Sequence, residues 1–271
     1  EGSLLYNSSI FISDKFLFNS DLVTSDQASV IFNHYSYDSS FLESNDVSLV
    51  LNVNDKKISL MAEYLDEENY YLPYYKTYTS VENVDWDIIN EDLFFYNKNT
   101  LDIAPSFFPQ EDLFPNWSVT SNSANIDLKK KQLKLNDVDE LQISDAYILP
   151  RNGEVEIGEN FSISKLYDSE IILDTINEYH RFINASVDIN SKDQFIGSGI
   201  YEYVNFNNDT FNIPFSEFKL VETFDENEQK IKTSFSSGVV DKKSPILMEP
   251  GFNFFGNIEL AKNGLHMLKS K

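Results

Sequence analysis

The sequence predicts an all-β fold of stacked, mostly antiparallel sheets, arranged as a solenoid-like or jelly-roll array with few or no helices. Apolar and polar residues alternate along many short segments, which is the period of a half-buried strand. The residues between these segments are rich in Asn, Asp, Ser and Gly, which favour turns. No stretch of ten or more residues shows the 3.6-residue period of an amphipathic helix.

Strands and turns can be assigned in chain order from this pattern. The clearest alternation is in four segments, 29–37, 46–53, 184–190 and 231–239, where aromatic and β-branched residues favour a pleated surface. Turn residues cluster at 52–57, 150–154, 205–210, 224–230 and 261–265. The Asn-Gly pairs in two of these clusters are strong turn signals, because both residues tolerate positive φ.

One eleven-residue pattern occurs twice, as NIDLKKKQLKL at 125–135 and as NIELAKNGLHM at 257–267. Looser versions occupy 45–60 and 83–96. Each version is typical of a β-hairpin or a solenoid corner, in which two strands flank a polar connection. We interpret the recurrence as architecture: each unit covers the apolar face of its neighbour and places Ile126 and Ile258 in a shared interior. Chance recurrence of such hairpins in a β-rich chain is the alternative.

Proline placement predicts a boundary near the middle of the chain. Pro105, Pro109 and Pro115 fall within eleven positions, and proline cannot donate to a β-ladder. We therefore predict an N-terminal β segment (1–104), a Pro/Phe-rich connection (105–117) and a C-terminal β segment (118–271) that pack as one continuous body.

Composition excludes several classes of function. The chain has 271 residues and a net charge of −23, with 44 acidic and 21 basic residues. Such a field repels phosphate backbones, so we expect no nucleic-acid partner, and it also repels anionic membrane surfaces. The absence of Cys removes disulfides and thiol catalysis. No apolar run approaches the roughly 20 residues of a membrane-spanning helix.

Catalytic signatures are weak throughout the sequence. His34, His180 and His266 are far apart and lack the spacing of a metal or protease motif, so we interpret them as ordinary strand or surface histidines. The many acidic residues leave a β-scaffold carbohydrate-active enzyme open as a remote alternative, although no carboxylate pair stands out. We expect a non-enzymatic protein.

An aromatic stretch at 64–86 offers a candidate binding surface. Exposed Tyr71, Tyr74, Tyr75 and Trp86 on a flat β face would form a platform for sugar rings. An acidic protein would favour a neutral glycan over an anionic one. The alternative is that these residues form cross-strand aromatic pairs that stabilise a sheet.

Calcium is the one cofactor for which the sequence offers ligands. Asn205, Asn207 and Asp209 supply oxygen atoms at close spacing, and Ca²⁺ prefers six to eight oxygens. The loop motif of helical calcium-binding proteins is absent. Separately, Gly197 and Gly199 lie inside a strand pattern and predict a β-bulge, a bend or a close approach of another backbone.

Four elements resemble a segment of large uncharacterised β-rich cell-envelope proteins of Bacteroidota. These are Tyr179–His180 at a strand end, Asn-Ala-x-Val-x-Ile (184–189), Phe-x-Gly-x-Gly-x-Tyr-x-Tyr (195–203) and Pro-Gly-Phe-x-Phe-x-Gly (250–256). The architecture is also similar to the lipopolysaccharide-transport (OstA-like) and AsmA-like folds, in which a sheet wraps a groove that carries lipid. The resemblance implies a long chain in the periplasm or at the outer-membrane surface of a Gram-negative bacterium, but no catalytic residue.

The sequence therefore predicts a non-catalytic structural or binding segment of a large cell-envelope protein, supporting transport or assembly at the outer membrane. The expected partners are other envelope proteins or further β units of the same longer chain, with lipid or neutral glycan as candidate ligands. A start at Glu1, without Met, and an end directly after a repeat-like unit favour a piece of a longer protein. The alternative is a surface glycan-binding module that uses the aromatic platform.

Overall fold

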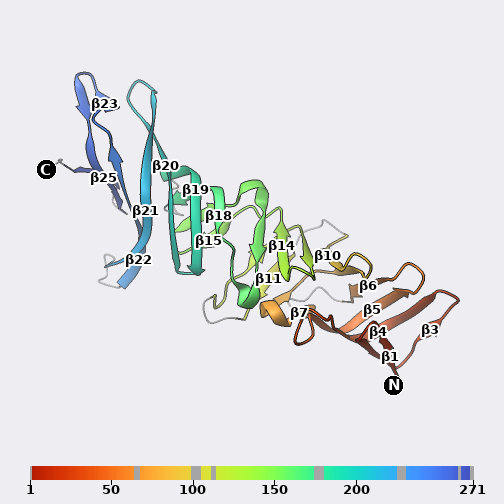
Figure 1. The fold of residues 1–271 in the computed structure, drawn as a ribbon. Coiled ribbons are helices and arrows are strands. Elements are labelled where there is room, and N and C mark those ends of the chain that lie inside the picture. Colours follow the sequence, from red (N-terminus) through yellow and green to blue (C-terminus); the bar gives the residue numbers. More distant parts are fainter. Residues whose placement is uncertain are drawn as a thin grey trace. The chain divides into compact units, whose positions relative to one another are not determined.

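The computed structural model describes residues 2–63, 68–98, 105–110, 114–173, 180–224, 230–261 and 264–268. Strands make up 63% of the chain, and the helical content is limited to short 3₁₀ turns, so the predicted all-β class is confirmed. The sheets are antiparallel and curl into half-barrels (Figure 1). No helix within the described residues has the length and apolar character needed to cross a membrane.

The chain forms two compact units, and their boundary differs from the predicted one. Unit 1 comprises Glu1–Asp139 and Gly153–Ile163, and unit 2 comprises Glu140–Asn152 and Ser164–Lys271. The chain therefore passes from unit 1 to unit 2, back to unit 1, and finally to unit 2. The expected break at 105–117 instead lies inside unit 1.

Unit 1 contains a 15-stranded sheet and two 3₁₀ turns, η1 (Pro73–Tyr75) and η3 (Glu159–Phe161). Its strands are β1 (Gly2–Tyr6), β2 (Ser9–Ser13), β3 (Leu17–Phe18), β4 (Leu22–Phe32), β5 (Leu42–Asn52), β6 (Lys57–Ala62), β7 (Tyr70–Leu72), β8 (Thr77–Thr79), β9 (Asn83–Asp87), β10 (Asp92–Tyr96), β11 (Ser106–Pro109), β12 (Val119–Thr120), β13 (Ser123–Asp127), β14 (Gln132–Asn136) and β17 (Val155–Ile157).

The repeated sequence pattern accounts for the middle of this sheet. Three of the look-alike segments form the hairpins β5–β6, β9–β10 and β13–β14, which lie side by side in that order, with β17 after β14. Because register is preserved from hairpin to hairpin, buried residues line up across the strands. One row consists of Val23, Leu51, Ile58, Trp86, Leu93, Ile126, Leu133 and Ile157.

A second row lies two residues away on the same face. It consists of Leu49, Leu60, Val84, Phe95, Ala124, Leu135 and Val155. Burial of one such aliphatic or aromatic side chain is worth roughly 1.5–3 kcal/mol, so these two rows are a large contribution to the stability of unit 1. The rings of Phe32 and Phe41 fill the interior beside them, with centroids 4.9 and 5.2 Å from that of Trp86.

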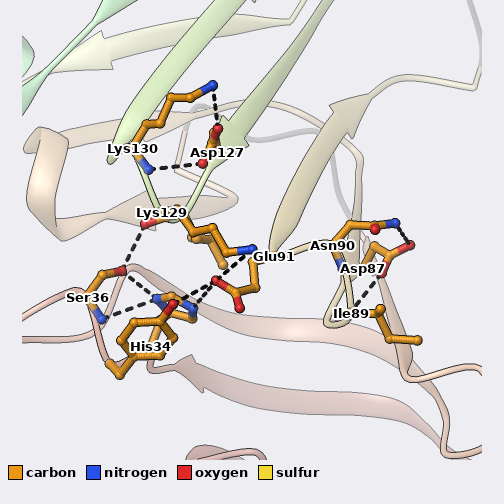
Figure 2. Close-up of polar contacts among 11 residues, drawn as sticks. His34, Ser36, Asp87, Ile89, Asn90, Glu91, Asp127, Lys129 and Lys130 are labelled. Carbon is orange, nitrogen blue, oxygen red and sulfur yellow. Dashed lines mark hydrogen bonds and ion pairs between the residues drawn. The ribbon is translucent and has the colours of Figure 1, made fainter.

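The three hairpins also share one turn geometry. Each connection has four residues, and the last one, Lys56, Glu91 or Lys131, adopts positive φ of 52°, 63° and 53°. Ahead of each connection stands Asn52, Asp87 or Asp127. In each case the Oδ1 atom of this residue accepts a 3.0 Å hydrogen bond from the backbone N–H three positions later. The donors are Asp55 for Asn52, Asn90 for Asp87 and Lys130 for Asp127, and Figure 2 shows the last two turns.

The turns stack on one another as the strands do. The Ile88 N–H donates to the Lys56 carbonyl at 3.1 Å, and the Leu128 N–H donates to the Glu91 carbonyl at 3.0 Å. In the first hairpin, the Val53 N–H donates to the Asp21 carbonyl at 2.9 Å. The recurring Asn/Asp-x-x-x pattern in the sequence thus specifies a repeating corner as well as a repeating strand.

The first part of the Pro/Phe-rich segment forms β11, a strand of unit 1, rather than a connection between domains. β11 pairs with β8 and with β12, and Phe107 is fully buried. The prolines bracket this short strand, since Pro105 precedes it and Pro109 is its last residue. A proline at a strand end removes no interior ladder bond, which explains why proline content misplaced the boundary.

Unit 2 contains a nine-stranded sheet, a two-stranded sheet and the 3₁₀ turn η2 (Arg151–Gly153), which reaches across the unit boundary. Its large sheet is formed by β15 (Leu141–Ile143), β16 (Ala146–Leu149), β18 (Leu166–Leu173), β19 (His180–Ser191), β20 (Gln194–Val204), β21 (Thr210–Phe224), β22 (Lys230–Val240), β25 (Gly256–Ala261) and β26 (Gly264–Leu268), and its small sheet by β23 (Ile246–Glu249) and β24 (Phe252–Phe254).

Neighbouring strands of the large sheet follow chain order, so unit 2 is a meander (Figure 1). The predicted irregularity at its glycines is confirmed. The β19–β20 ladder shifts register between Ile183 and Ser186, and the β20–β21 ladder shifts between Gly197 and Gly199. A Cβ on Gly197 would lie 2.6 Å from the Ser186 carbonyl oxygen, so only glycine fits there.

The second copy of the eleven-residue pattern is also a hairpin, β25–β26, and Ile258 is fully buried, as is Ile126. The two copies nevertheless differ in register. In the first copy Asp127 faces Gln132, whereas in the second copy Glu259 faces His266, and Ala261 faces Gly264 across a two-residue connection.

Candidate functional site

The predicted aromatic platform is not assembled, because two of its four residues lie in the core. Trp86 and Tyr75 are 1% and 0% exposed. Trp86 belongs to the first buried row, since it alternates with Asp85 and Asp87 along β9. The expectation of an exposed ring is therefore wrong for both residues. The alternation in NVDWD is the sequence signal that places Trp86 inward.

Tyr74 and Tyr75 lie in η1, with ring planes at 88° to each other rather than coplanar. The Tyr75 hydroxyl is 3.3 Å from that of Tyr37, and burial raises the pKa of Tyr37 to about 12 and that of Tyr75 further. Lys131 Nζ lies 5.3 and 5.5 Å from the ring centroids of Tyr37 and Tyr74. These contacts tie η1 to the β13–β14 turn, which is a structural role.

Tyr71, the fourth residue of the predicted platform, has a different setting. It faces Tyr78 across the β7–β8 pair, with ring centroids 4.7 Å apart and planes inclined at 34°. Both side chains are half-buried. Tyr78 was not among the predicted site residues; the register of the β7–β8 pair places it on the same face as Tyr71.

The tyrosine pair lines a cleft where the first sheet forks. β5 pairs with β6 through Val47–Asn52 but with β7 at Glu43, so its two neighbours diverge between these positions. Asp46 adopts positive φ at the fork (56°), and the β4–β5 ladder shifts register on either side of Ala28. The cleft has a volume of about 680 Å³. A smaller hollow of about 490 Å³ shares Ile12, Ser29 and Asp46 with it.

The cleft lining is acidic and polar. Four carboxylates, Glu43, Asp46, Glu63 and Glu68, contribute to it, and none of its described lining residues is basic. Polar residues complete the wall beside the tyrosines, namely Ser29, Ser44, Asn45 and Asn69.

A second polar cluster surrounds His34 at the stacked turns (Figure 2). His34 Nδ1 is 2.5 Å from Ser36 Oγ, which donates to the Leu128 carbonyl at 2.9 Å. His34 Nε2 lies 3.3 Å from Glu91 Oε2 without the alignment of a hydrogen bond, and Lys129 Nζ is 3.6 Å from the same oxygen. Burial lowers the pKa of His34, against the opposing effect of Glu91.

The order Ser36, His34 and Glu91 superficially suggests a nucleophile, a base and an acid. The Ser36 hydroxyl, however, is engaged by the Leu128 carbonyl, and the Ser36 N–H also points at His34 Nδ1, at 3.3 Å. The cluster joins the segment after β4 to two hairpin turns. We therefore assign it to folding rather than to chemistry.

The candidate calcium ligands form a turn. Asn205 is buried, and its Oδ1 accepts hydrogen bonds of 2.9 Å from the backbone N–H groups of both Asn207 and Asp209. Its Nδ2 donates to the Leu247 carbonyl at 3.1 Å. Both lone pairs of the amide oxygen are thus occupied. Across the described part of the chain, no group of three or more Asp, Glu, His or Cys residues converges to hold a metal.

The remaining histidines occupy strands of unit 2. His180 begins β19, where its Nδ1 is 3.2 Å from the Tyr201 hydroxyl, and His266 lies in β26. These positions agree with their interpretation as strand residues.

Comparison with known proteins adds no family to this description. No protein-family model, curated protein sequence or solved structure matches the chain. The resemblance to Bacteroidota envelope proteins therefore stays a prediction, and functional inference rests on the geometry of the chain itself.

Proposed function

We propose that this chain is a non-catalytic β segment of a larger cell-envelope protein, located in the periplasm or at the outer-membrane surface of a Gram-negative bacterium. Its role is to provide a structural body that supports transport or assembly. Its partners are other envelope proteins or further β units of the same chain.

The observation that supports this proposal is the stacking of three hairpins with the same turn geometry. Their strands contribute to one buried row that crosses eight strands, from Val23 to Ile157, and their turns are hydrogen-bonded in series. Units of this kind cover one another's apolar faces, so a body can be lengthened by adding hairpins. A repeat that specifies interior packing and corners, rather than a set of reactive groups, favours architecture over catalysis.

The charge is consistent with such a body. A net charge of −23 keeps a long β structure soluble and discourages association of strand edges. In the part of unit 1 that the structure describes, the polar groups around His34 are the closest to a catalytic arrangement, and their hydrogen bonds join the segment after β4 to the hairpin turns.

Two variants in the native host test the proposal. Trp86→Asp places a charge in the buried row, and Ile89→Asp places the same charge on an exposed turn residue, 63% accessible. We expect the full-length protein to fractionate with the periplasm or outer membrane. We also expect Trp86→Asp, but not Ile89→Asp, to reproduce the detergent sensitivity of a gene deletion. A cytoplasmic protein, or normal detergent resistance in the deletion strain, would contradict the proposal.

A further inference from the structure

We propose that the cleft at the fork of the first sheet binds a neutral saccharide. This inference goes beyond the structural role, because it assigns a ligand class to a specific site. It rests on the tyrosine pair, the size of the cleft and the chemistry of its lining.

The tyrosine pair supplies the apolar surface that a sugar ring needs. Tyr71 and Tyr78 are cross-strand neighbours with centroids 4.7 Å apart, and both line the cleft. A pyranose ring presents C–H groups on its faces, and these pack against aromatic rings. The tyrosine hydroxyls add polar groups at the ring edge, which can form hydrogen bonds with sugar hydroxyls.

The cleft is of a suitable size and is held open by its own hydrogen bonds. Its volume of about 680 Å³ falls within the range of about 300–1,000 Å³ typical of small-molecule sites. On one side Gln27 Nε2 donates to Asp46 Oδ1 at 2.9 Å. On the other side Asn69 Nδ2 donates to the carbonyls of Ser80 and Val81 at 3.3 and 3.2 Å. A preformed cleft lowers the ordering cost of binding.

The lining selects against a negatively charged ligand. Ionised carboxylates only accept hydrogen bonds, and sugar hydroxyls are donors, so the pairing is charge-assisted. An anionic sugar would meet four carboxylates and no base among the described lining residues. A metal ion is disfavoured as well, since the described carboxylates do not converge in groups of three or more. Acceptors spread along a wall suit the several hydroxyls of a neutral saccharide.

The experiment measures binding of the whole chain to soluble polysaccharides by affinity gel electrophoresis. The probes are mixed-linkage β-glucan, mannan and dextran, with polygalacturonate as the anionic comparison. We expect at least one neutral probe to retard the protein. Tyr71→Ala and Tyr78→Ala should each weaken that binding about tenfold or more, whereas Tyr167→Ala, which removes an exposed tyrosine from unit 2, should not change it.

Folding of each variant is checked by tryptophan fluorescence, since Trp86 and Trp117 both belong to unit 1. Glu68→Gln, an exposed substitution in the same cleft, gives a second variant and should weaken binding a few-fold. The proposal is overturned if no neutral probe binds, if polygalacturonate binds better, or if folded tyrosine variants bind as wild type does. None of these results bears on the envelope role, which is tested by fractionation and detergent sensitivity.

Discussion

Replacing Asp87 by alanine should destabilise unit 1 by about 1–2 kcal/mol. The Asp87 Oδ1 accepts hydrogen bonds from the N–H groups of Ile89 (3.1 Å) and Asn90 (3.0 Å), and Oδ2 accepts one from Asn90 Nδ2 at 3.0 Å (Figure 2). All three bonds are exposed, so water replaces part of each one, and the net loss lies at the lower end of the range of about 0.5–1.5 kcal/mol per bond. Loss of a comparable helix cap costs about 0.5–2 kcal/mol.

The matched control is Asp87→Asn, because asparagine keeps the Oδ1 acceptor and Asn52 already fills this position in the first hairpin. We expect Asp87→Asn to cost less than half as much as Asp87→Ala. Asp127→Ala should show a smaller effect than Asp87→Ala, about 0.5–1 kcal/mol, since Asp127 Oδ1 accepts the Lys130 N–H at 3.0 Å and its Oδ2 pairs with the exposed Lys130 Nζ, an ion pair that water screens.

The assay is urea unfolding followed by tryptophan fluorescence, which reports on unit 1 because both tryptophans belong to it. Midpoints at a common slope convert directly into differences in the free energy of unfolding. The capped-turn explanation fails if Asp87→Ala leaves the midpoint unchanged, or if asparagine destabilises as much as alanine. Either result would mean that side-chain capping does not hold the repeated corner.

Three further predictions concern pH and packing. Burial, with repulsion from Asp127 and Asp87, raises the pKa of Asp92, so its charge opposes folding, and this cost grows as the pH rises from the ordinary value of 3.8 through the folded-state pKa. Asp92→Asn should therefore raise the free energy of unfolding at pH 7 by about 0.2–1 kcal/mol, a small gain because Asp92 is exposed and water screens the repulsion, and the gain should shrink at pH 3. The pKa of His34 is lowered from its ordinary value of 6.5, so the unfolded chain binds more protons than the folded chain near and below that pH. The free energy of unfolding should therefore fall from pH 7 to pH 5, and His34→Gln should flatten this decline. An equally steep decline in the variant would refute the role of His34 in the pH dependence. Gly197→Ala should destabilise unit 2 by about 1–3 kcal/mol in calorimetry, because its Cβ would lie 2.6 Å from the Ser186 carbonyl oxygen. Gly199→Ala is the matched control and should destabilise unit 2 less, since its Cβ would lie 3.4 Å from the nearest atoms. Equal losses of stability would contradict the explanation by close backbone approach at Gly197.

Local patterns in the sequence were sufficient to predict the hairpins. Alternation along 46–53 and around 125–135 identified strands, and Asn and Asp at the turns identified corners, because these properties depend on neighbours in the chain. Register depended on turn length, however. The segments 125–135 and 257–267 are similar in sequence but differ in register, because Asp127 pairs with Gln132 in the first whereas Ala261 pairs with Gly264 in the second.

The candidate site was only partly predictable. Tyr71 was identified within an aromatic stretch, and Tyr78 faces it across the local β7–β8 pair. The cleft itself depends on the fork at β5, where β6 and β7 diverge, and no local pattern predicts that divergence. The alternation of polar and apolar residues in β9 indicates that Trp86 is buried. No sequence pattern indicates the division of the chain into two units. That division follows from the pairing of β17 with β14, a contact between segments separated by the first hairpin of unit 2.

The return of the chain to unit 1 has a consequence for the order of folding. β17 supplies Val155 and Ile157, which pair with Leu135 and Leu133 on β14. During synthesis the N-terminal unit therefore cannot close until residues 153–163 have left the ribosome, by which time β15 and β16 are already available. A recombinant fragment that stops at Asp139 would leave β14 as an open, aggregation-prone edge, whereas one that extends through Ile163 would not.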